Sequence, residues 1–404
     1  MKHHVYILSH GFGNIGDFAI FKGTLRVLRG VSPSIKINVI DPLPLPKEYL
    51  DFHVEWTPYR SLFSNVPNRI LSYSISGIRA TLGFEIPFHA ERREGVLWHR
   101  GCSGYDGYHG TLPLLLNTTR TLSITKGFSL RILGGLSLGF YRNSFERTII
   151  KRFATSWDYI LVREPLSRYY LVRAGVSKPN IYLLHDFAFN VEDRCSERAR
   201  RVVEKIRDYN SGPRVAVSIR DYYYDYDPHT YSSYIRFIGS LLKVLVERFH
   251  VFLIPMSFSS GHENDIEFIK RLVEAKVIPS SVVPLYRVAY MDPEEVICLL
   301  KNFDAGIGIR THFCILNAIA GTPVIHLYYE HKGKGIFDYS LRGVLPQISL
   351  FKAIHNQSNV IDQILCSLNS MINMKGAMNR LLKEIVFRNR LHNQKIIKHI
   401  MRGV

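Results

Sequence analysis

Arg310 and His312 are the two residues whose types and spacing point most directly to chemistry. Arginine carries a permanent charge on a planar fork that matches a phosphate or a carboxylate, and histidine titrates near neutrality and can give or take a proton. Lys332 and Lys334 follow in a glycine-containing loop. These residues predict a site that binds a small anion and transfers a proton. A surface arginine beside a helix-capping histidine is the alternative.

The residues around this pair predict a strand, a helix and a second strand. An apolar run ends at Arg310, a helix begins at about His312, Gly321 stops it, and a β-branched run follows Pro323. In open α/β sheets, ligands gather where strands end and helices begin, because backbone N–H groups and the positive ends of helix dipoles point into one crevice. The pair is therefore expected at a ligand site.

A glycine loop near the N-terminus is the second candidate element. Gly11, Gly13 and Gly16 precede an amphipathic helix that begins at about Asp17, and glycines let a backbone turn sharply and approach a ligand. Their spacing fits a dinucleotide fingerprint, but a carboxylate at Asp17 would repel a pyrophosphate, which argues against NAD. Asp17 is expected either to hold or deprotonate a sugar hydroxyl or to cap the helix.

Arg220 is a second arginine that follows a short apolar run. Two guanidinium groups at strand ends would clamp one small polyanion from two sides. Tyr222 lies in the acidic, tyrosine-rich stretch 221–227, whose rings and carboxylates suit sugar rings and hydroxyls. The alternative is a surface loop that packs on its neighbours. His262 and Glu263, in the corresponding loop of the next strand, are candidates of lower rank.

Several of these residues carry a resemblance to a known family. The run 304–312, with Ala318, Gly321, Pro323 and the segment 329–332, resembles the C-terminal signature of the polysaccharide pyruvyl transferases. Residues 11–20 are similar to that family's N-terminal glycine motif. Three mid-chain blocks also resemble the family: 162–176, 185–189 and 217–220. The resemblance spans residues 1–345 in the right order and is thinnest over 45–130.

The resemblance implies transfer of the enolpyruvyl group of phosphoenolpyruvate to two hydroxyls of a sugar, forming a cyclic pyruvate ketal and releasing phosphate. On this basis Arg220, Arg310 and Lys332 bind phosphoenolpyruvate. His312 is the candidate acid that protonates the enol carbon, and Asp17 is the candidate base. The acceptor side is expected to include four residues of the glycine motif and the tyrosine stretch: Gly13, Asn14, Gly16 and Tyr222.

The expected partners are phosphoenolpyruvate, as co-substrate rather than cofactor, and a sugar or a lipid-linked glycan as acceptor. The sequence shows no cluster with metal-ligand spacing. Phosphate chemistry often recruits a divalent ion, so a metal requirement stays open.

Alternating strand and helix patterns predict two Rossmann-like α/β domains that face a cleft, as in the GT-B glycosyltransferases. Length and a hydrophobic content of 46% suffice for two cores. We expect an N-terminal domain on the acceptor side over 1–190, with the glycine motif, and a junction helix and linker over 191–213. A donor-side domain over 214–350 and basic C-terminal helices over 351–404 would follow.

The net charge of +18 predicts attraction to polyanions. No zinc finger, basic heptad region or RNP-type strand accompanies it, which argues against nucleic acid. Between Lys375 and Arg402, eight basic residues stand against one acid, Glu384, and apolar residues recur at helical spacing. These apolar residues are Leu381, Leu382, Ile385, Val386, Ile396, Ile397 and Ile400. Such a helix would dock on the protein or lie on an anionic membrane.

Cysteine usage and hydropathy predict a cytoplasmic protein. The five cysteines are scattered, odd in number and never in a Cys-x-x-Cys spacing, which suits reduced thiols rather than disulfides or a zinc site. Apolar runs fall short of the ~20 residues that a membrane span needs. The N-terminus leads into a strand pattern without a signal-peptide core. A lipid-linked acceptor would add peripheral contact with the inner face of the membrane.

Two other functions fit parts of the pattern. A glycosyltransferase of the same fold would use a nucleotide-sugar and need a ribose-binding carboxylate, for which Glu330 is available. A non-enzymatic protein that binds anionic lipid or polymer would explain the charge and the basic C-terminus. It would not explain a glycine loop in one domain and an Arg-x-His at a strand end of the other.

Overall fold

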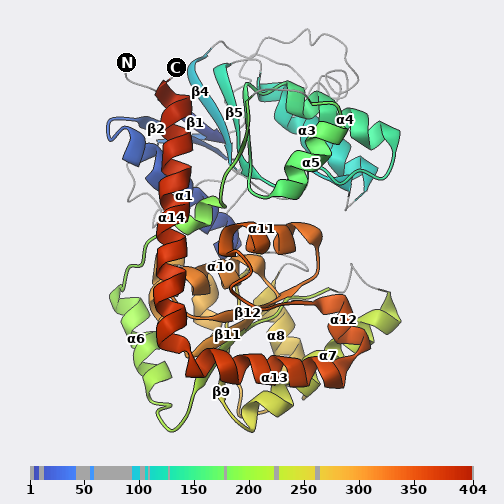
Figure 1. Ribbon diagram of the computed structural model, residues 1–404, viewed down its shortest axis with the longest axis vertical. Coiled ribbons are helices and arrows are strands. Elements are labelled where there is room, and N and C mark those ends of the chain that lie inside the picture. Colours follow the sequence, from blue (N-terminus) through green and yellow to red (C-terminus); the bar gives the residue numbers. More distant parts are fainter. Residues whose placement is uncertain are drawn as a thin grey trace. The chain divides into compact units, whose positions relative to one another are not determined.

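The computed structural model of the chain divides into two compact units, which are described separately (Figure 1). Unit 1 contains residues 1–11, 24–186 and 391–404, and unit 2 contains residues 12–23 and 187–390. The structure describes residues 4–8, 13–41, 55–58, 93–100, 105–107, 110–125, 128–176, 180–222, 227–259 and 264–402. Several sequence candidates lie outside this part of the chain: Gly11, Cys102, residues 223–226, His262 and Glu263.

Within the described residues, unit 1 is built on seven parallel strands in the order β3-β2-β1-β4-β5-β6-β7. They are β1 (His4–Leu8), β2 (Lys36–Asp41), β3 (Glu55–Pro58), β4 (Arg93–Arg100), β5 (Phe128–Leu136), β6 (Tyr159–Val162) and β7 (Ile181–Leu183). In the central strand, Ile7 lies opposite Val39 on one side and Trp98 on the other. All three are buried, as expected for a parallel sheet covered by helices on both faces.

Three helices of unit 1 each follow a strand and therefore begin at the carboxyl edge of its sheet. They are α3 (Thr111–Thr125), α4 (Ser144–Thr155) and α5 (Pro165–Arg173). Asn143 caps α4, because its side chain accepts the backbone N–H of Glu146 at 2.9 Å. Glu164 caps α5 in the same way, and Pro165 supplies a preset backbone angle at the first position. Local sequence thus sets where both helices start.

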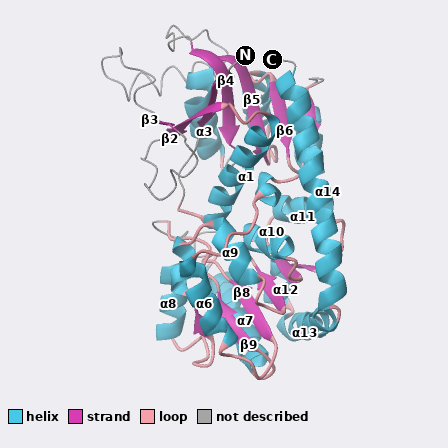
Figure 2. Cartoon of the chain, turned by 90° about the vertical axis from the view of Figure 1, so that its left-hand side faces the viewer, coloured by secondary structure: helices cyan, strands magenta, loops and turns pink. Residues whose placement is uncertain are grey.

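Unit 2 contains, among its described residues, six parallel strands in the order β10-β9-β8-β11-β12-β13. They are β8 (Arg214–Ser218), β9 (His250–Leu253), β10 (Val283–Pro284), β11 (Ala305–Gly308), β12 (Val324–Tyr328) and β13 (Gln347–Ser349). The helices are α6 (Glu197–Arg207), α7 (Pro228–Val246), α8 (Asp265–Glu274), α9 (Pro293–Leu300), α10 (Thr311–Ala320), α11 (His331–Leu341), α12 (Leu350–His355) and α13 (Gln357–Asn373). Figure 2 shows helices around both sheets. The alternation of strand and helix predicted from the sequence is confirmed.

The division into units runs through two long helices, α1 (Ile15–Val31) and α14 (Lys375–Arg402). The beginning of α1, with the glycine motif, belongs to unit 2, whereas the sequence pattern placed that motif in an N-terminal domain. The last part of α14 belongs to unit 1. The expected boundaries at 190 and 213 also differ from the structural division, which falls after Asp186 and keeps α6 in unit 2.

Most of the apolar face predicted for the C-terminal helix is buried. Leu382, Ile385 and Ile397 are at most 5% exposed. Two polar side chains of the same face are satisfied within the protein, since Asn389 donates to the carbonyl of Ser340 at 2.9 Å, and Asn393 forms hydrogen bonds with the backbone of His185. This face therefore docks on the protein. Contact of the exposed basic face with a membrane stays a prediction.

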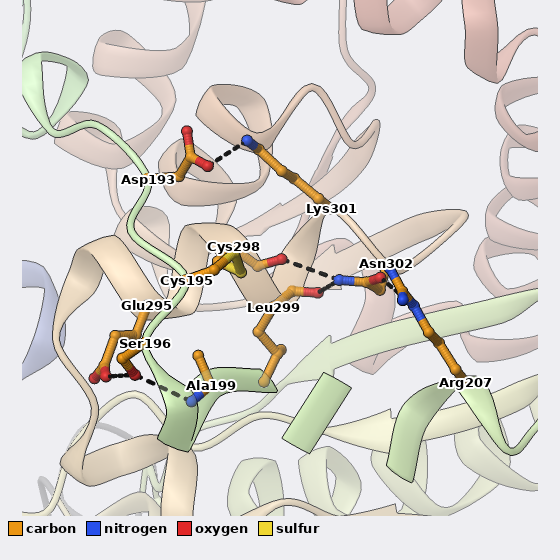
Figure 3. Close-up of a disulfide and its surroundings, with 10 residues drawn as sticks. All are labelled: Asp193, Cys195, Ser196, Ala199, Arg207, Glu295, Cys298, Leu299, Lys301 and Asn302. Carbon is orange, nitrogen blue, oxygen red and sulfur yellow. Dashed lines mark hydrogen bonds and ion pairs between the residues drawn. A yellow bond between two sulfur atoms is a disulfide. The ribbon is translucent and has the colours of Figure 1, made fainter. Parts of the chain in front are cut away.

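A disulfide joins Cys195, just before α6, to Cys298 in α9 (Figure 3). The expectation of reduced thiols is therefore wrong for these two residues. They are separated by 103 positions, with Cα atoms 5.5 Å apart. Only the packing of α6 against α9 brings them together, so no local spacing could reveal the pair. The buried thiol of Cys314 and the exposed thiol of Cys366 are free.

Candidate functional site

The carboxyl edge of the unit 2 sheet carries the predicted cations. Arg220 follows β8, Arg310 follows β11, and Lys332 follows β12. Strand β11 pairs with β8 on one side and with β12 on the other, all parallel. Their carboxyl ends therefore meet along one edge, which is where ligands bind in sheets of this kind. The structure thus brings the three segments together, as the sequence predicted.

Arg310 is held by a buried carboxylate that the sequence analysis missed. Its Nη2 and Nε donate to Asp265, at 2.6 and 3.3 Å, and this aspartate also accepts the backbone N–H of Met256 at 3.0 Å. Asp265 is fully buried. Burial raises its pKa, while the charges of Arg310 and Arg220 oppose that rise. Nothing in the sequence distinguishes Asp265 from an ordinary residue at the start of a helix.

Arg220 lies against two tyrosine rings. Its guanidinium carbon is 4.6 Å from the ring centre of Tyr222 and 5.0 Å from that of Tyr329, and its Nη1 donates to the Tyr329 hydroxyl at 2.8 Å. These contacts hold the cation by cation–π attraction and one hydrogen bond. Tyr222, predicted on the acceptor side, is 1% exposed, so its ring supports Arg220 from within the protein.

Arg220 and Arg310 act electrostatically on the same groups. Burial raises the pKa of Tyr329, and the nearby charge of Glu330 raises it further, whereas both arginines oppose the rise. The two arginines also both counter the rise at Asp265. The phenol of Tyr329 therefore stays neutral at physiological pH.

Lys332 lies in a helix rather than in the predicted loop. Helix α11 begins at His331, so both Lys332 and Lys334 are helical. The ammonium of Lys332 meets Glu330 at 2.9 Å. A Cβ on Gly333 would stand only 2.8 Å from Thr311 Oγ1, so the first turns of α10 and α11 touch each other. Two adjacent helix N-termini add positive potential to this edge.

His312 packs against the glycine motif. A Cβ on Gly16 would lie 2.5 Å from His312 Nδ1 and 2.7 Å from His312 Cβ, closer than side-chain atoms approach, so only glycine admits this ring. Gly13 is less constrained, because a Cβ there would meet the Ser259 hydroxyl, which can rotate away, and would lie 3.2 Å from the Ser259 Cα and Cβ. Its carbonyl accepts the backbone N–H of Phe258 at 3.0 Å and the hydroxyl of Ser257 at 3.1 Å.

Asn14, not Asp17, caps the helix that follows the glycine motif. Helix α1 begins at Ile15, and the Asn14 side chain accepts the backbone N–H of Gly16 at 2.8 Å. The interpretation of Asp17 as the cap is therefore wrong. Asp17 lies half-buried in the first turn, next in sequence to the glycine that receives the His312 ring. The candidate base and the candidate acid thus both lie in unit 2.

Lys22 anchors this end of α1, and sequence reasoning did not single it out. The side chain is 2% exposed and its ammonium lies 3.1 Å from Asp292 and 3.2 Å from Glu294, which flank the start of α9. Arg194 reaches the same two carboxylates. A buried lysine is tolerated because its charge is paired. This anchor fixes the helix that positions Gly16 and Asp17.

The carboxyl edge of unit 1 has a different chemistry. Arg163, after β6, lies 2.7 Å from the buried Asp186 and donates to Ser137 at 3.0 Å. Arg163 thus forms a structural ion pair with Asp186, while Glu164 accepts the backbone N–H of Ser167 at 2.9 Å.

Among the described residues, no group of three or more His, Cys, Asp or Glu side chains could hold a metal ion. Among the helices described, none is long and apolar enough to cross a membrane.

Comparison with known proteins adds the family. A model of the polysaccharide pyruvyl transferase family matches residues 14–331, a range that begins after Gly11 and Gly13 and ends just before Lys332. Along nearly its whole length the chain is similar to the amylovoran biosynthesis protein AmsJ of Erwinia amylovora. The two are 19% identical over an alignment of 430 residues, gaps included, that covers 98% of each chain.

Solved structures give the fold. The chain is similar to Anabaena Alr3699/HepE in complex with UDP and glucose, with a TM-score of 0.60, 10% identity and 100% of both chains covered. It is also similar to a glycosyltransferase from Rickettsia africae ESF-5, with a TM-score of 0.56, 13% identity and coverage of 98% and 99%. The predicted fold class, two Rossmann-like α/β units with a GT-B-like likeness, is confirmed. With the family match over most of its length, the chain belongs to the polysaccharide pyruvyl transferase family.

Proposed function

We propose that the chain transfers the enolpyruvyl group of phosphoenolpyruvate to two hydroxyls of a sugar in a polysaccharide or its precursor. One observation carries the proposal: Arg220, Arg310 and Lys332 follow neighbouring strands of one sheet, beside the His312 ring and two helix N-termini. A small substrate with both a phosphate and a carboxylate needs several fixed cations. The similarity to a protein of amylovoran biosynthesis supports an exopolysaccharide as the product.

In this proposal the donor is bound by preorganised charges. Asp265 fixes Arg310, and Tyr222 with Tyr329 fixes Arg220, so little side-chain freedom is lost when phosphoenolpyruvate binds. Lys332 and the N-termini of α10 and α11 add further positive potential. A divalent ion is not required by these contacts, and metal dependence is left to measurement.

The reaction then needs one proton delivered to carbon and two removed from hydroxyls. His312 protonates the enol carbon of phosphoenolpyruvate, which makes the neighbouring carbon electrophilic. Asp17 accepts the proton of the first sugar hydroxyl as its oxygen forms a bond to that carbon. The bond to the phosphate oxygen breaks, the second hydroxyl closes the ring, and its proton leaves with phosphate. The products are a cyclic ketal and inorganic phosphate.

A nucleotide-sugar glycosyltransferase is the second candidate. The likeness to a structure in complex with UDP and glucose favours it. It would use Glu330 to bind a ribose, but in this chain Glu330 lies 2.9 Å from Lys332. A ribose would have to compete with that ion pair. Pyruvyl transfer uses the same lysine directly and therefore accounts for more of the site.

A double-label assay separates the two functions. The protein is incubated with the lipid-linked glycan fraction of the cells from which the chain derives, and with phosphoenolpyruvate labelled in both its carbon and its phosphorus. Pyruvyl transfer sends the carbon label into the glycan and the phosphorus label into inorganic phosphate. Glycosyl transfer leaves both labels in phosphoenolpyruvate and moves label only from a nucleotide-sugar. That second pattern would overturn the proposal. We place the reaction on the cytoplasmic side of the membrane, where phosphoenolpyruvate is made.

A further inference from the structure

Unit 1 exposes a group of large apolar side chains on three neighbouring helices and on the turn before α4, and we call it the α3–α5 face. Its members are Leu112, Leu116, Phe140, Phe145, Tyr169 and Val172, which are between 41% and 64% exposed. Single exposed apolar residues are common on soluble proteins, but a contiguous group marks an interaction surface.

Contacts show that the face is continuous. At one end, Arg142 donates to Thr111 at 3.3 Å and so joins the start of α3, next to Leu112, to the start of α4. At the other end, the Phe140 ring lies 6.2 Å from that of Tyr170, centre to centre, and Tyr169 lies 5.6 Å from the same ring. Helices α3, α4 and α5 also lie side by side in unit 1 (Figure 1).

The exposed charges of this face are all positive. Six basic side chains on α4, α5 and the turn before α4 are exposed: Arg142, Arg147, Lys151, Arg152, Arg168 and Arg173. Between residues 110 and 176 the acids are Glu146, Asp158 and Glu164. Glu146 and Glu164 are at most 2% exposed. Asp158 is paired with Arg131 at 2.7 Å. Apolar side chains surrounded by cations complement a surface that is anionic outside and apolar beneath.

We propose that the α3–α5 face docks unit 1 on an anionic lipid bilayer. Phe145, Tyr169 and Val172 enter the interface between headgroups and acyl chains, and Lys151 and Arg152 with their neighbours bind the lipid phosphates. A soluble protein partner would need acids placed to match six cations, whereas an anionic bilayer offers negative charge and an apolar layer together along its whole surface. The charge pattern therefore favours lipid.

The position of the face suits the proposed function, on which this step rests. Helices α3, α4 and α5 each begin at the carboxyl edge of the unit 1 sheet, where sheets of this kind bind ligands. Leu112 and Phe145 lie in the first turns of their helices. A glycan carried on a membrane lipid would thus meet the edge of unit 1 directly from the bilayer. The acceptor class that fits is a lipid-linked glycan.

Co-sedimentation of the full chain with vesicles tests the proposal. We expect the wild type to bind vesicles of phosphatidylcholine mixed with phosphatidylglycerol, and to bind pure phosphatidylcholine poorly. The triple variant Phe145→Ser, Tyr169→Ser, Val172→Ser should lose at least about tenfold in partition, since three apolar side chains no longer leave water. The double variant Lys151→Gln, Arg152→Gln should weaken binding to the anionic vesicles alone.

The matched control uses the other surface that combines exposed apolar and basic groups, on α14. The variant Phe387→Ser, Leu391→Ser removes two side chains that are 59% and 49% exposed there, and it should bind vesicles like the wild type. Loss of binding in this variant instead of the triple variant would overturn the proposal and assign the membrane to α14. The proposal is also wrong if the wild type does not bind anionic vesicles and is a dimer, while the triple variant is a monomer. That result would show that a second copy of the chain covers the face.

Phosphoenolpyruvate titration of the same proteins separates this proposal from the proposed function. The triple variant should bind phosphoenolpyruvate as the wild type does, since its changes lie in unit 1. If the wild type binds vesicles through the α3–α5 face but never binds phosphoenolpyruvate, the proposed function fails and the membrane surface stands. Binding of phosphoenolpyruvate without any vesicle binding sinks the membrane proposal alone.

Discussion

In unit 1 the arginine after β6, Arg163, meets the buried Asp186 at 2.7 Å, and in unit 2 the arginine after β11, Arg310, meets the buried Asp265 at 2.6 Å. Both pairs lie at the carboxyl edge of a parallel sheet, and both arginines are under 10% exposed. The surroundings differ. Unit 1 adds one acid, Glu164, and one cation, Arg100 at the end of β4, whereas unit 2 adds the cations Arg220 and Lys332.

The comparison shows that a strand-end arginine with a buried partner does not by itself mark an anion site. In unit 1, Arg163 pairs with Asp186, and Glu164 accepts a backbone N–H at the start of α5, so these charges stabilise the fold. In unit 2 the acids of these segments are each paired, Asp221 with Arg271, Asp265 with Arg310 and Glu330 with Lys332, and with Arg220 four cations stand against three acids. That excess of positive charge, with a titratable ring beside it, is what an anionic substrate requires.

Removing the buried acid from each pair gives the largest expected effect. Asp265→Ala and Asp186→Ala each leave an arginine buried without its carboxylate, which should lower the free energy of unfolding by about 3–5 kcal/mol in urea denaturation. The milder variants Asp265→Asn and Asp186→Asn keep the shape of the side chain. Of these two, only Asp265→Asn should weaken phosphoenolpyruvate binding. Equal loss of binding in both would remove the distinction between the two edges.

His312→Ala tests the proton transfer that distinguishes unit 2. We expect turnover to fall by about 10²–10⁴-fold, the usual contribution of a general acid, with phosphoenolpyruvate affinity changed only a few-fold. The measurement is release of phosphate in the presence of acceptor. His355→Ala, on the exposed side of α12, is the control and should turn over normally. Wild-type rates in His312→Ala would remove the acid from the mechanism.

The core of unit 2 should also be sensitive to acid. Burial lowers the pKa of His326 to about 4, although a hydrogen bond that its Nδ1 donates to Gln347 opposes the shift. The unfolded chain, with an ordinary histidine pKa near 6.5, therefore binds the proton more readily than the folded chain. The free energy of unfolding is therefore unaffected by this group above pH ~6.5. It falls by about 3 kcal/mol in total as the pH drops towards 4.

His326→Gln should flatten this part of the pH profile. The full chain is unfolded in urea at several pH values between neutrality and 4, and hydrogen exchange of the unit 2 strands is used to monitor the unfolding of that unit. If the wild type and the variant lose stability in parallel, another group is responsible for the acid sensitivity.

Tyr329→Phe should give the smallest effect, because it removes one hydrogen bond and keeps the aromatic contact. Losing the bond from Arg220 is worth about 1 kcal/mol, or a several-fold rise in KM for phosphoenolpyruvate, with kcat unchanged. The control is Tyr290→Phe, on a tyrosine that is 52% exposed. A fall in kcat without a change in KM would mean that Tyr329 takes part in the transfer rather than in holding Arg220.

Sequence patterns predicted the fold because its signals are local. Apolar runs, capping residues such as Asn143, and the stop at Gly321 mark strands and helices one at a time. The start of α11 was misjudged because two of its first five residues are glycines, which favour a loop. Helix α3 was missed, since no acid or clear amphipathic face marks its start.

The candidate site was predictable only in part. Arg310 and His312 stand at a strand-to-helix junction that the sequence displays. Asp265, which holds Arg310, and Lys22, which anchors α1, are far in sequence from the residues that they contact, as the two disulfide cysteines are from each other. Such contacts depend on tertiary packing, and no spacing in one sequence records them. Gly16 was likewise recognised as part of a glycine motif. The sequence did not show that the His312 ring is the reason why a glycine is needed there.

Isothermal titration with phosphoenolpyruvate tests the central claim most directly. The wild type is compared with Arg310→Gln and with Arg163→Gln, a matched change at a buried strand-end arginine of unit 1. We predict that phosphoenolpyruvate binds to the wild type and to Arg163→Gln, and that binding is lost in Arg310→Gln. Equal binding by all three proteins, or heat from a nucleotide-sugar and none from phosphoenolpyruvate, would contradict a phosphoenolpyruvate site at the carboxyl edge of unit 2.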